Sequence, residues 1–108
     1  MKHELQIMKE HFQAIKTGAK TAELRLETIS VKYHIGDILI LKEWDTIRSI
    51  YTGEQTHRQV SFITRPSGSI PGVSPYWVIL HMGEIRVTAE NRDEFDPQMK
   101  LYPHPIGV

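Results

Sequence analysis

Three side chains of complementary charge stand within six residues near the N-terminus: Lys20, Glu23 and Arg25. The stretch 21–28 alternates polar and apolar residues, so as a strand it would place Glu23, Arg25 and Glu27 on one face. A carboxylate acceptor beside a guanidinium with five donors can hold the polar edge of a planar ligand. A nearby lysine can reach a phosphate or a carbonyl oxygen. The pattern therefore predicts one strand face with organised charge.

The same residues also have ordinary structural interpretations. Lys20 could be a solvated loop lysine, and the bare sequence favours that interpretation. Glu23 and Arg25 could form an ion pair on an exposed face, worth about 0 to 1 kcal/mol. Glu27 has no further support and is expected at the surface.

The aromatic residues offer a second kind of contact. Trp44 is expected at the end of a strand, where an indole can stack on a base for about 1 to 3 kcal/mol. A core position for Trp44 is equally compatible with the sequence. Trp77 and Phe62 are expected in the core, whereas Tyr76 could line a cleft or pack against neighbours.

The elements that must position these residues form a mainly β domain. A short helix is expected over 9–17, with Phe12 and Ile15 inward and Gly18 as its C-terminal cap. Strands are expected at 3–7, 21–28, 38–44, 55–64 and 76–82, with an edge strand at 84–89 and turns at 33–37 and 51–54. The strand at 76–82 should close a barrel.

Two segments have the composition of irregular structure. Residues 65–75 contain three prolines and two glycines, which predicts a restricted loop placed as a lid over a ligand site. Residues 91–108 are predicted to be a tail or arm, which leaves 1–90 as the single folded domain.

Composition excludes several classes of function. The 13 basic and 13 acidic residues balance, which argues against a protein that coats nucleic acid and leaves only local RNA contacts. The absence of cysteine removes disulfides and thiolate nucleophiles. The six histidines lack the spacing of metal ligands, so neither a metal site nor a cofactor is expected. The longest apolar run, at 38–41, is too short for a membrane span, and without a secretion signal the protein is expected in the cytoplasm.

The pattern Gly18-x-Lys20-x-x-Glu23-x-Arg25 resembles the signature of ASCH domains, small β-barrel modules similar to the PUA domains that bind RNA. The resemblance continues through 36–45, 51–54 and 76–80, in the order found in a short ASCH-like group of bacterial and phage proteins. It covers roughly the first eighty residues. It implies an α+β, mainly β fold: a small PUA-like barrel with one or two short helices.

The resemblance implies that the domain binds a nucleotide or a short single-stranded RNA. Lys20 would contact a phosphate or a base carbonyl, Glu23 and Arg25 would contact polar edges, and Trp44 would stack. The resemblance also favours a binding-site role for Lys20, Glu23 and Arg25 over the surface interpretation. It does not indicate an oligomeric state.

The alternative is an amidohydrolase acting on N4-acetylcytidine-type nucleosides, with Lys20 and Glu23 as catalytic residues. Some ASCH proteins use a lysine, a threonine and a glutamate for this reaction. Here Glu23 stands where their threonine falls, and 65–75, which corresponds to the source of their glutamate, has no carboxylate. Binding is therefore ranked above catalysis. A nuclease would need acid-base or metal residues that the histidines do not supply, and an interaction module working through the acidic tail is a third class.

Overall fold

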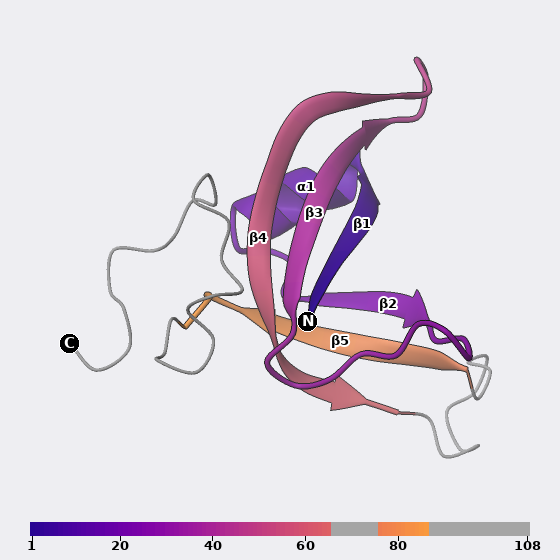
Figure 1. The fold of residues 1–108 in the computed structure, drawn as a ribbon. Helices are drawn as coiled ribbons and strands as arrows, with labels where there is room; N and C mark the ends of the chain where they lie inside the picture. Colours follow the sequence, from indigo (N-terminus) through magenta and orange to yellow (C-terminus); the bar gives the residue numbers. More distant parts are fainter. Residues whose placement is uncertain (66–75, 87–108) are drawn as a thin grey trace.

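The computed structural model describes residues 1–65 and 76–86. In these residues the chain forms one short helix and five strands (Figure 1), so the domain is mainly β with a single helix, as the sequence predicts. In chain order the elements are β1 (Lys2–Met8), α1 (Lys9–Lys16), β2 (Ala22–Leu26), β3 (Ile38–Asp45), β4 (Ile50–Thr64) and β5 (Trp77–Gly83).

The strands form one strongly coiled sheet in the order β1-β3-β4-β5-β2. β1 and β3 are parallel, and every other neighbouring pair is antiparallel. β4 is 15 residues long and continues from the upper hairpin down to β5, which runs with β2 across the lower end of the molecule (Figure 1). β1 and β2 are the two ends of the strand order. The barrel expected from the sequence is therefore left open between β1 and β2, a gap called the seam below.

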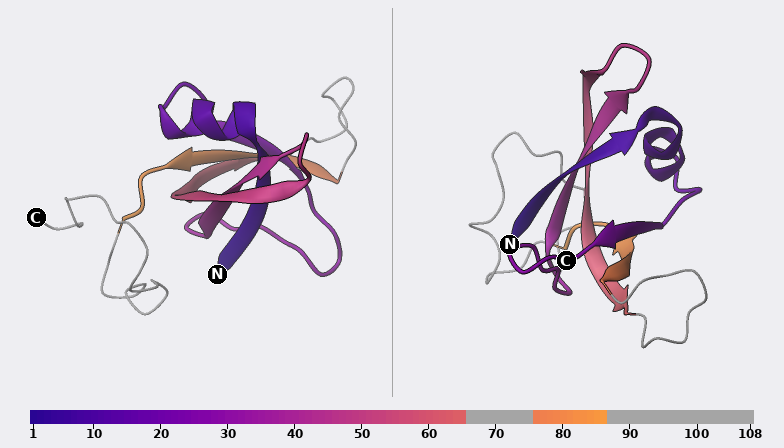
Figure 2. Two further views of the ribbon diagram at one scale, coloured as in Figure 1. Left: turned by 90° about the horizontal axis from the view of Figure 1, so that it is seen from above. Right: turned by 90° about the vertical axis from the view of Figure 1, so that its right-hand side faces the viewer.

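Helix α1 covers one face of the sheet (Figure 2), where it packs against β1 and β3. Phe12 and Ile15 are buried there, as the helical spacing predicts. Alternate residues of the strands supply the rest of the core. They include Leu5, Ile7, Leu39, Leu41, Val60, Val78, Leu80 and Met82.

The first hairpin turns earlier than predicted. The turn occupies residues 46–49, whereas the sequence analysis placed it at 51–54, which belong to β4. Asp45 fixes it, because its Oδ1 accepts hydrogen bonds from the backbone N–H groups of Ile47 (3.0 Å) and Arg48 (3.1 Å). Such local side-chain to backbone bonds stabilise a tight turn without glycine.

The prediction that Phe62 lies in the core is wrong, since Phe62 is 57% exposed. The β4–β5 register shifts between Val60 and Phe62, which makes Ser61 an extra, bulged residue. One inserted residue reverses the alternation of a strand. Phe62 therefore faces outward and Ile63 packs against the core. Trp77, also expected in the core, is half-buried.

Some predictions fall on residues that the structure does not describe. The proline-rich segment after Arg65, its role as a lid, the tail at 91–108 and most of the edge strand at 84–89 lie outside the described residues. Residues 84–86, which are described, are not in a strand. None of the helical structure in the described part of the chain is long and apolar enough to cross a membrane.

Candidate functional site

The side chains of Lys20, Glu23 and Arg25 converge on one another. Lys20 Nζ donates to Glu23 Oε1 at 2.7 Å, and Arg25 Nε donates to Glu23 Oε2 at 3.0 Å. A second guanidinium nitrogen of Arg25 lies 2.9 Å from the same oxygen. Glu23 is only 8% exposed, so its carboxylate is held between two cations inside the domain. The sequence analysis considered an exposed ion pair between Glu23 and Arg25, but the Glu23 carboxylate of this pair is buried.

A glycine turn brings Lys20 to this position. Gly18 has φ +87°, a left-handed conformation that residues with a Cβ rarely adopt, and it ends α1. The backbone N–H of Lys20 then donates to Ala14 O at 3.0 Å, which folds the connection back against the helix. β2 starts two residues later and places Glu23 and Arg25 beside the lysine.

Arg25 also links the two sides of the seam, because its Nη2 donates to Gln6 O of β1 at 2.9 Å. Next to this link lies a cleft of about 310 Å³. Its walls come from the end of β1, the first turn of α1 and β2. The lining residues are Gln6, Ile7, Met8, His11, Lys20, Glu23, Leu24 and Arg25. All three members of the predicted charged cluster therefore line one concavity.

His11 is a member of the site that the sequence analysis missed. Its Nδ1 lies 3.1 Å from Lys20 Nζ. No spacing rule reveals this contact, because it depends on the return of the chain after Gly18. The beginning of α1 also faces the cleft, and its N-cap residue, Met8, provides no side-chain cap for the helix N–H groups.

The cluster keeps N–H donors that no described residue accepts. Among the described residues, Arg25 Nη1 has no hydrogen-bond partner, and Lys20 has three N–H donors for its two neighbours, Glu23 and His11. Two cations and one carboxylate leave a formal charge of +1. The cleft therefore offers cationic N–H donors to an anionic or carbonyl oxygen.

A second cleft, of about 320 Å³, adjoins the first, and Lys20 lines both. It lies beside the C-terminal turn of α1. Lys16 and Arg58 line it together with Glu84, and Arg58 Nη2 donates to Ile15 O at 3.0 Å. Lys16 and Arg58 are thus further cations beside the charged cluster.

Trp44 lies apart from the charged cluster and does not line either cleft. It pairs in register with Met8 on the face of β3 opposite the core residue Glu43, and it is half-buried. Its ring makes an edge contact with Tyr51, with centroids 4.9 Å apart. The structure thus brings Lys20, Glu23 and Arg25 together and leaves Trp44 on the outer face.

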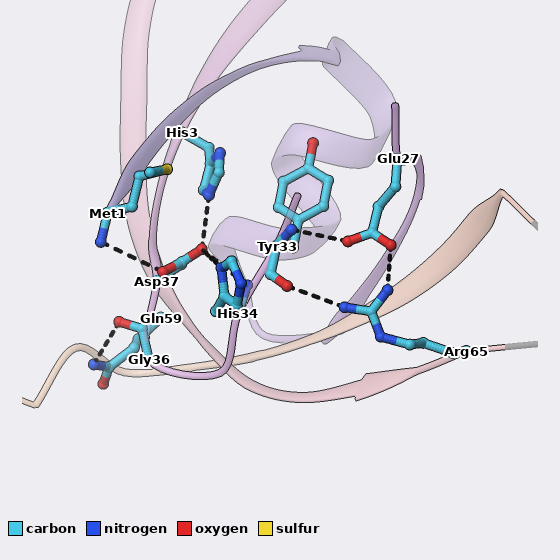
Figure 3. A network of polar contacts seen from close by, with 9 residues as sticks. All are labelled: Met1, His3, Glu27, Tyr33, His34, Gly36, Asp37, Gln59 and Arg65. Atoms are coloured by element: carbon cyan, nitrogen blue, oxygen red, sulfur yellow. Dashed lines mark hydrogen bonds and ion pairs between the residues drawn. The ribbon is translucent and has the colours of Figure 1, made fainter. Parts of the chain in front are cut away.

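Glu27 is not the surface residue that the sequence analysis expected. It is 6% exposed, forms an ion pair with Arg65 and accepts a hydrogen bond from Tyr33 N at 2.9 Å (Figure 3). Burial alone would raise the pKa of Glu27, but Arg65 and the Tyr33 N–H outweigh it and hold that pKa below its usual range. Glu27 is the first residue after β2, and it continues the inward alternation of Glu23 and Arg25.

A further buried carboxylate, Asp37, ties the start of β1 to the turn before β3 (Figure 3). Its Oδ2 contacts His3 Nε2 at 2.8 Å and accepts from His34 N at 2.9 Å. The N-terminal ammonium lies 3.4 Å from its other oxygen. Burial opposes ionisation, yet these contacts together lower the pKa of Asp37.

Between these two carboxylates stands Tyr33, which is 3% exposed and has its ring 4.6 Å from that of His3. Figure 3 shows the Tyr33 hydroxyl pointing away from the backbone contacts that Tyr33 makes with Glu27 and Arg65. Burial raises the pKa of Tyr33, Arg25 opposes that rise, and the carboxylates of Glu27 and Glu23 add to it. The phenol therefore stays neutral and lies within electrostatic reach of the charged cluster.

No metal centre is built from the described residues, which contain no group of three or more His, Asp or Glu side chains placed to hold an ion.

The sequence also matches a protein family. The profile of DUF3850, a domain of unknown function, matches residues 2–82. The chain belongs to this family. In this DUF3850 domain the matched range contains Lys20, Glu23 and Arg25 and all five described strands except Gly83, the last residue of β5. No curated protein matches the sequence.

Proposed function

We propose that this DUF3850 domain binds a nucleotide, alone or within single-stranded RNA, in the 310 Å³ cleft beside the seam between β1 and β2. The proposal treats the domain as an ASCH-like, PUA-related module. The observation that carries it is the buried Glu23 carboxylate, which holds Lys20 and Arg25 at 2.7 and 3.0 Å, while all three residues line one small cleft.

Internal pairing supports this role because it orders the donors before a ligand arrives. A free lysine or arginine side chain loses rotamer entropy on binding, a cost of roughly 0.5 to 1.5 kcal/mol for each immobilised side chain. Glu23 meets this cost in the folded protein. Each hydrogen bond from a charged donor to a ligand oxygen then contributes about 1.5 to 3 kcal/mol. Phosphate and base carbonyl oxygens are suitable acceptors for such donors.

Trp44 enters this proposal only for a longer ligand. Met8 lines the cleft and is the register partner of Trp44. An RNA strand that leaves the cleft past Met8 would therefore meet the indole, whereas a mononucleotide would not. Stacking by Trp44 is accordingly proposed for RNA alone.

Calorimetric titration of the full chain with nucleosides, nucleotides and short RNAs tests the proposal. We expect a nucleotide or RNA to bind, and Lys20→Ala and Arg25→Ala each to weaken binding about tenfold or more, since 1.4 kcal/mol is tenfold in affinity. Lys2→Ala is the matched control, because Lys2 is exposed and lies outside the cleft. A panel without any binding, or equal losses in Lys20→Ala and Lys2→Ala, would contradict the proposal.

An amidohydrolase acting on N4-acetylcytidine-type nucleosides is the second candidate, favoured by the 2.7 Å contact between Lys20 and Glu23. Catalysis would need Glu23 to accept a proton from water. Both of its oxygens already accept from cations, so binding remains the stronger proposal. Incubation with N4-acetylcytidine should yield no free cytidine, and turnover that is lost in Lys20→Ala would reverse the ranking.

A further inference from the structure

The hydrogen bonds between β2 and β5 reveal which backbone groups of β2 face the seam. Met82 N donates to Thr21 O at 2.9 Å, and Glu27 N donates to Tyr76 O at 2.8 Å. In an antiparallel ladder alternate residues direct both N–H and C=O toward the partner strand. The odd-numbered residues of β2 therefore face β5. Leu24, at an even position, directs its N–H and C=O toward the seam.

The parallel ladder between β1 and β3 gives the opposite wall. Ile38 N donates to Met1 O at 2.9 Å, which directs the odd-numbered residues of β1 toward β3. Gln6 then faces the seam, and the hydrogen bond from Arg25 to Gln6 O agrees with this assignment. Among the described strands, none pairs with either edge of the seam, and Gln6 and Leu24 bring backbone groups of both edges to the cleft.

Leu24 brings its seam-facing backbone N–H and C=O to the cleft. Its side chain is 48% exposed on the outer face of β2, opposite the inward face that carries Glu23 and Arg25, and yet Leu24 lines the cleft. In chain order, this part of β2 carries the Leu24 N–H, the Leu24 C=O and the Arg25 guanidinium. This is a donor, an acceptor and a second donor.

We propose that the Leu24 backbone, together with Arg25, determines specificity by pairing with the imide edge of a uracil-type base. This inference rests on the function proposed above. An imide edge presents an acceptor, a ring N–H donor and a second acceptor, the complement of the order found here. Guanine presents two donors beside one acceptor, and adenine has carbon at the third position. Neither purine matches all three groups.

An inserted peptide strand fits the seam less well than a single ring. The cleft, at about 310 Å³, lies at the lower limit of the roughly 300 to 1,000 Å³ typical of small-molecule sites. Arg25 also occupies Gln6 O, an acceptor that an added strand would need for its ladder. The occupant favoured by the geometry is a planar ring with one polar edge.

Uridine 5′-monophosphate and its N3-methyl analogue provide the first test, carried out on the unaltered chain. Methylation removes the central donor and leaves Leu24 C=O unpaired, so we expect affinity to fall at least about tenfold. The amide signal of Leu24 in NMR spectra should shift with the unmethylated nucleotide. Cytidine and purine monophosphates should bind more weakly than uridine monophosphate.

Leu24→Pro provides the second test, because proline removes the N–H that faces the seam and leaves the β5 ladder intact. We expect about a three- to tenfold loss of affinity for uridine monophosphate. Leu26→Pro is the control, since Leu26 has the same type and edge direction but lies outside the cleft. Leu24→Ala keeps the N–H and should retain affinity. Melting curves show whether each variant is folded.

The outcomes of these experiments distinguish failure of the Leu24 inference from failure of the proposed nucleotide binding. If nucleotides bind and Lys20→Ala weakens them, but N3-methylation changes nothing, the role of Leu24 is overturned and nucleotide binding stands. If no nucleotide or RNA binds, both proposals fail. A preference for purines over uridine monophosphate would also overturn the imide pairing.

Discussion

Glu27 is the buried charge with the clearest set of partners. One carboxylate oxygen meets Arg65 and the other accepts from Tyr33 N, so the residue joins the end of β4 to the segment after β2. Glu27→Gln keeps the shape but loses the ion pair and turns one acceptor into a donor facing a cation. We expect a loss of about 1 to 3 kcal/mol in the free energy of unfolding, measured by urea denaturation.

Glu54→Gln serves as the control for this change, because Glu54 is exposed on β4 and should stay within about 0.5 kcal/mol of the unaltered chain. Equal effects of the two substitutions would show that the buried pair has no net value. Such a result is physically conceivable, because desolvation can cancel the attraction within a buried ion pair.

At this scale the sequence predicts side-chain chemistry better than side-chain surroundings. Alternation along residues 23–27 places Glu23, Arg25 and Glu27 on one face, and the structure has this face inward. Period-two alternation does not state which face is buried, and charge would ordinarily indicate the solvent side. His11 and Arg65 depend on contacts between distant segments, which spacing along the chain does not encode.

The turn from α1 to β2 is the element on which the charged cluster depends. Gly18 has φ +87° with open space around its Cβ position, so Gly18→Ala would be strained by backbone conformation alone. We expect a loss of about 1 to 2 kcal/mol in unfolding free energy, together with weaker nucleotide binding because Lys20 is displaced. Thermal denaturation and calorimetric titration measure the two effects.

Gly83→Ala is the matched control for this change. Gly83 also has open space around its Cβ position, but its φ lies outside the left-handed region. Alanine there should be tolerated, with a change within about 0.5 kcal/mol. If both alanine variants behave alike, the conformation of Gly18 does not hold the site together.

The sequence predicts a helix or strand well when local residues determine its ends and its buried face. It predicts less well the features that depend on which strands pair. Helix α1 ends before a glycine and buries Phe12 and Ile15, all of which are local features. The bulge at Ser61 exists only because β4 must pair with β3 and then with β5 in a shifted register. The sequence of β4 alone does not indicate this shift, so simple alternation wrongly predicts that Phe62 faces the core.

In the described part of the chain the domain is a coiled sheet that stops short of closure, and the charged cluster of Lys20, Glu23 and Arg25 lies beside the gap. A closed barrel would pair β1 with β2 and satisfy their edges with each other. Here Arg25 bridges the two strands through a side chain, and a cleft remains beside the bridge. Alternation and helical spacing predict the described strands and the helix, but the gap between β1 and β2 is known only from the strand order.

Acid stability is the property that tests this interior as a whole. Three buried carboxyls, those of Glu27, Asp37 and Glu43, have pKa values lowered by their partners. The hydrogen bond from the Thr52 hydroxyl, at 2.6 Å, is the largest cause of the lowered pKa of Glu43. The hydrogen bond from Gln13, at 2.8 Å, lowers this pKa further, whereas burial raises it. In the unfolded chain these groups return to ordinary values of 4.5 for Glu and 3.8 for Asp.

Because the folded pKa values lie below the unfolded ones, the unfolded chain binds more protons as the solution becomes acidic. The stabilisation is fully present above the ordinary values and disappears as pH falls through the folded ones. Urea denaturation from pH 7 to pH 2 should therefore show a steep loss that begins near pH 4.5. Thr52→Val removes the main contact that lowers the pKa of Glu43, so its curve should lie lower at pH 7 and converge with the unaltered curve at pH 2. Parallel curves over the whole range would mean that Glu43 does not titrate with folding.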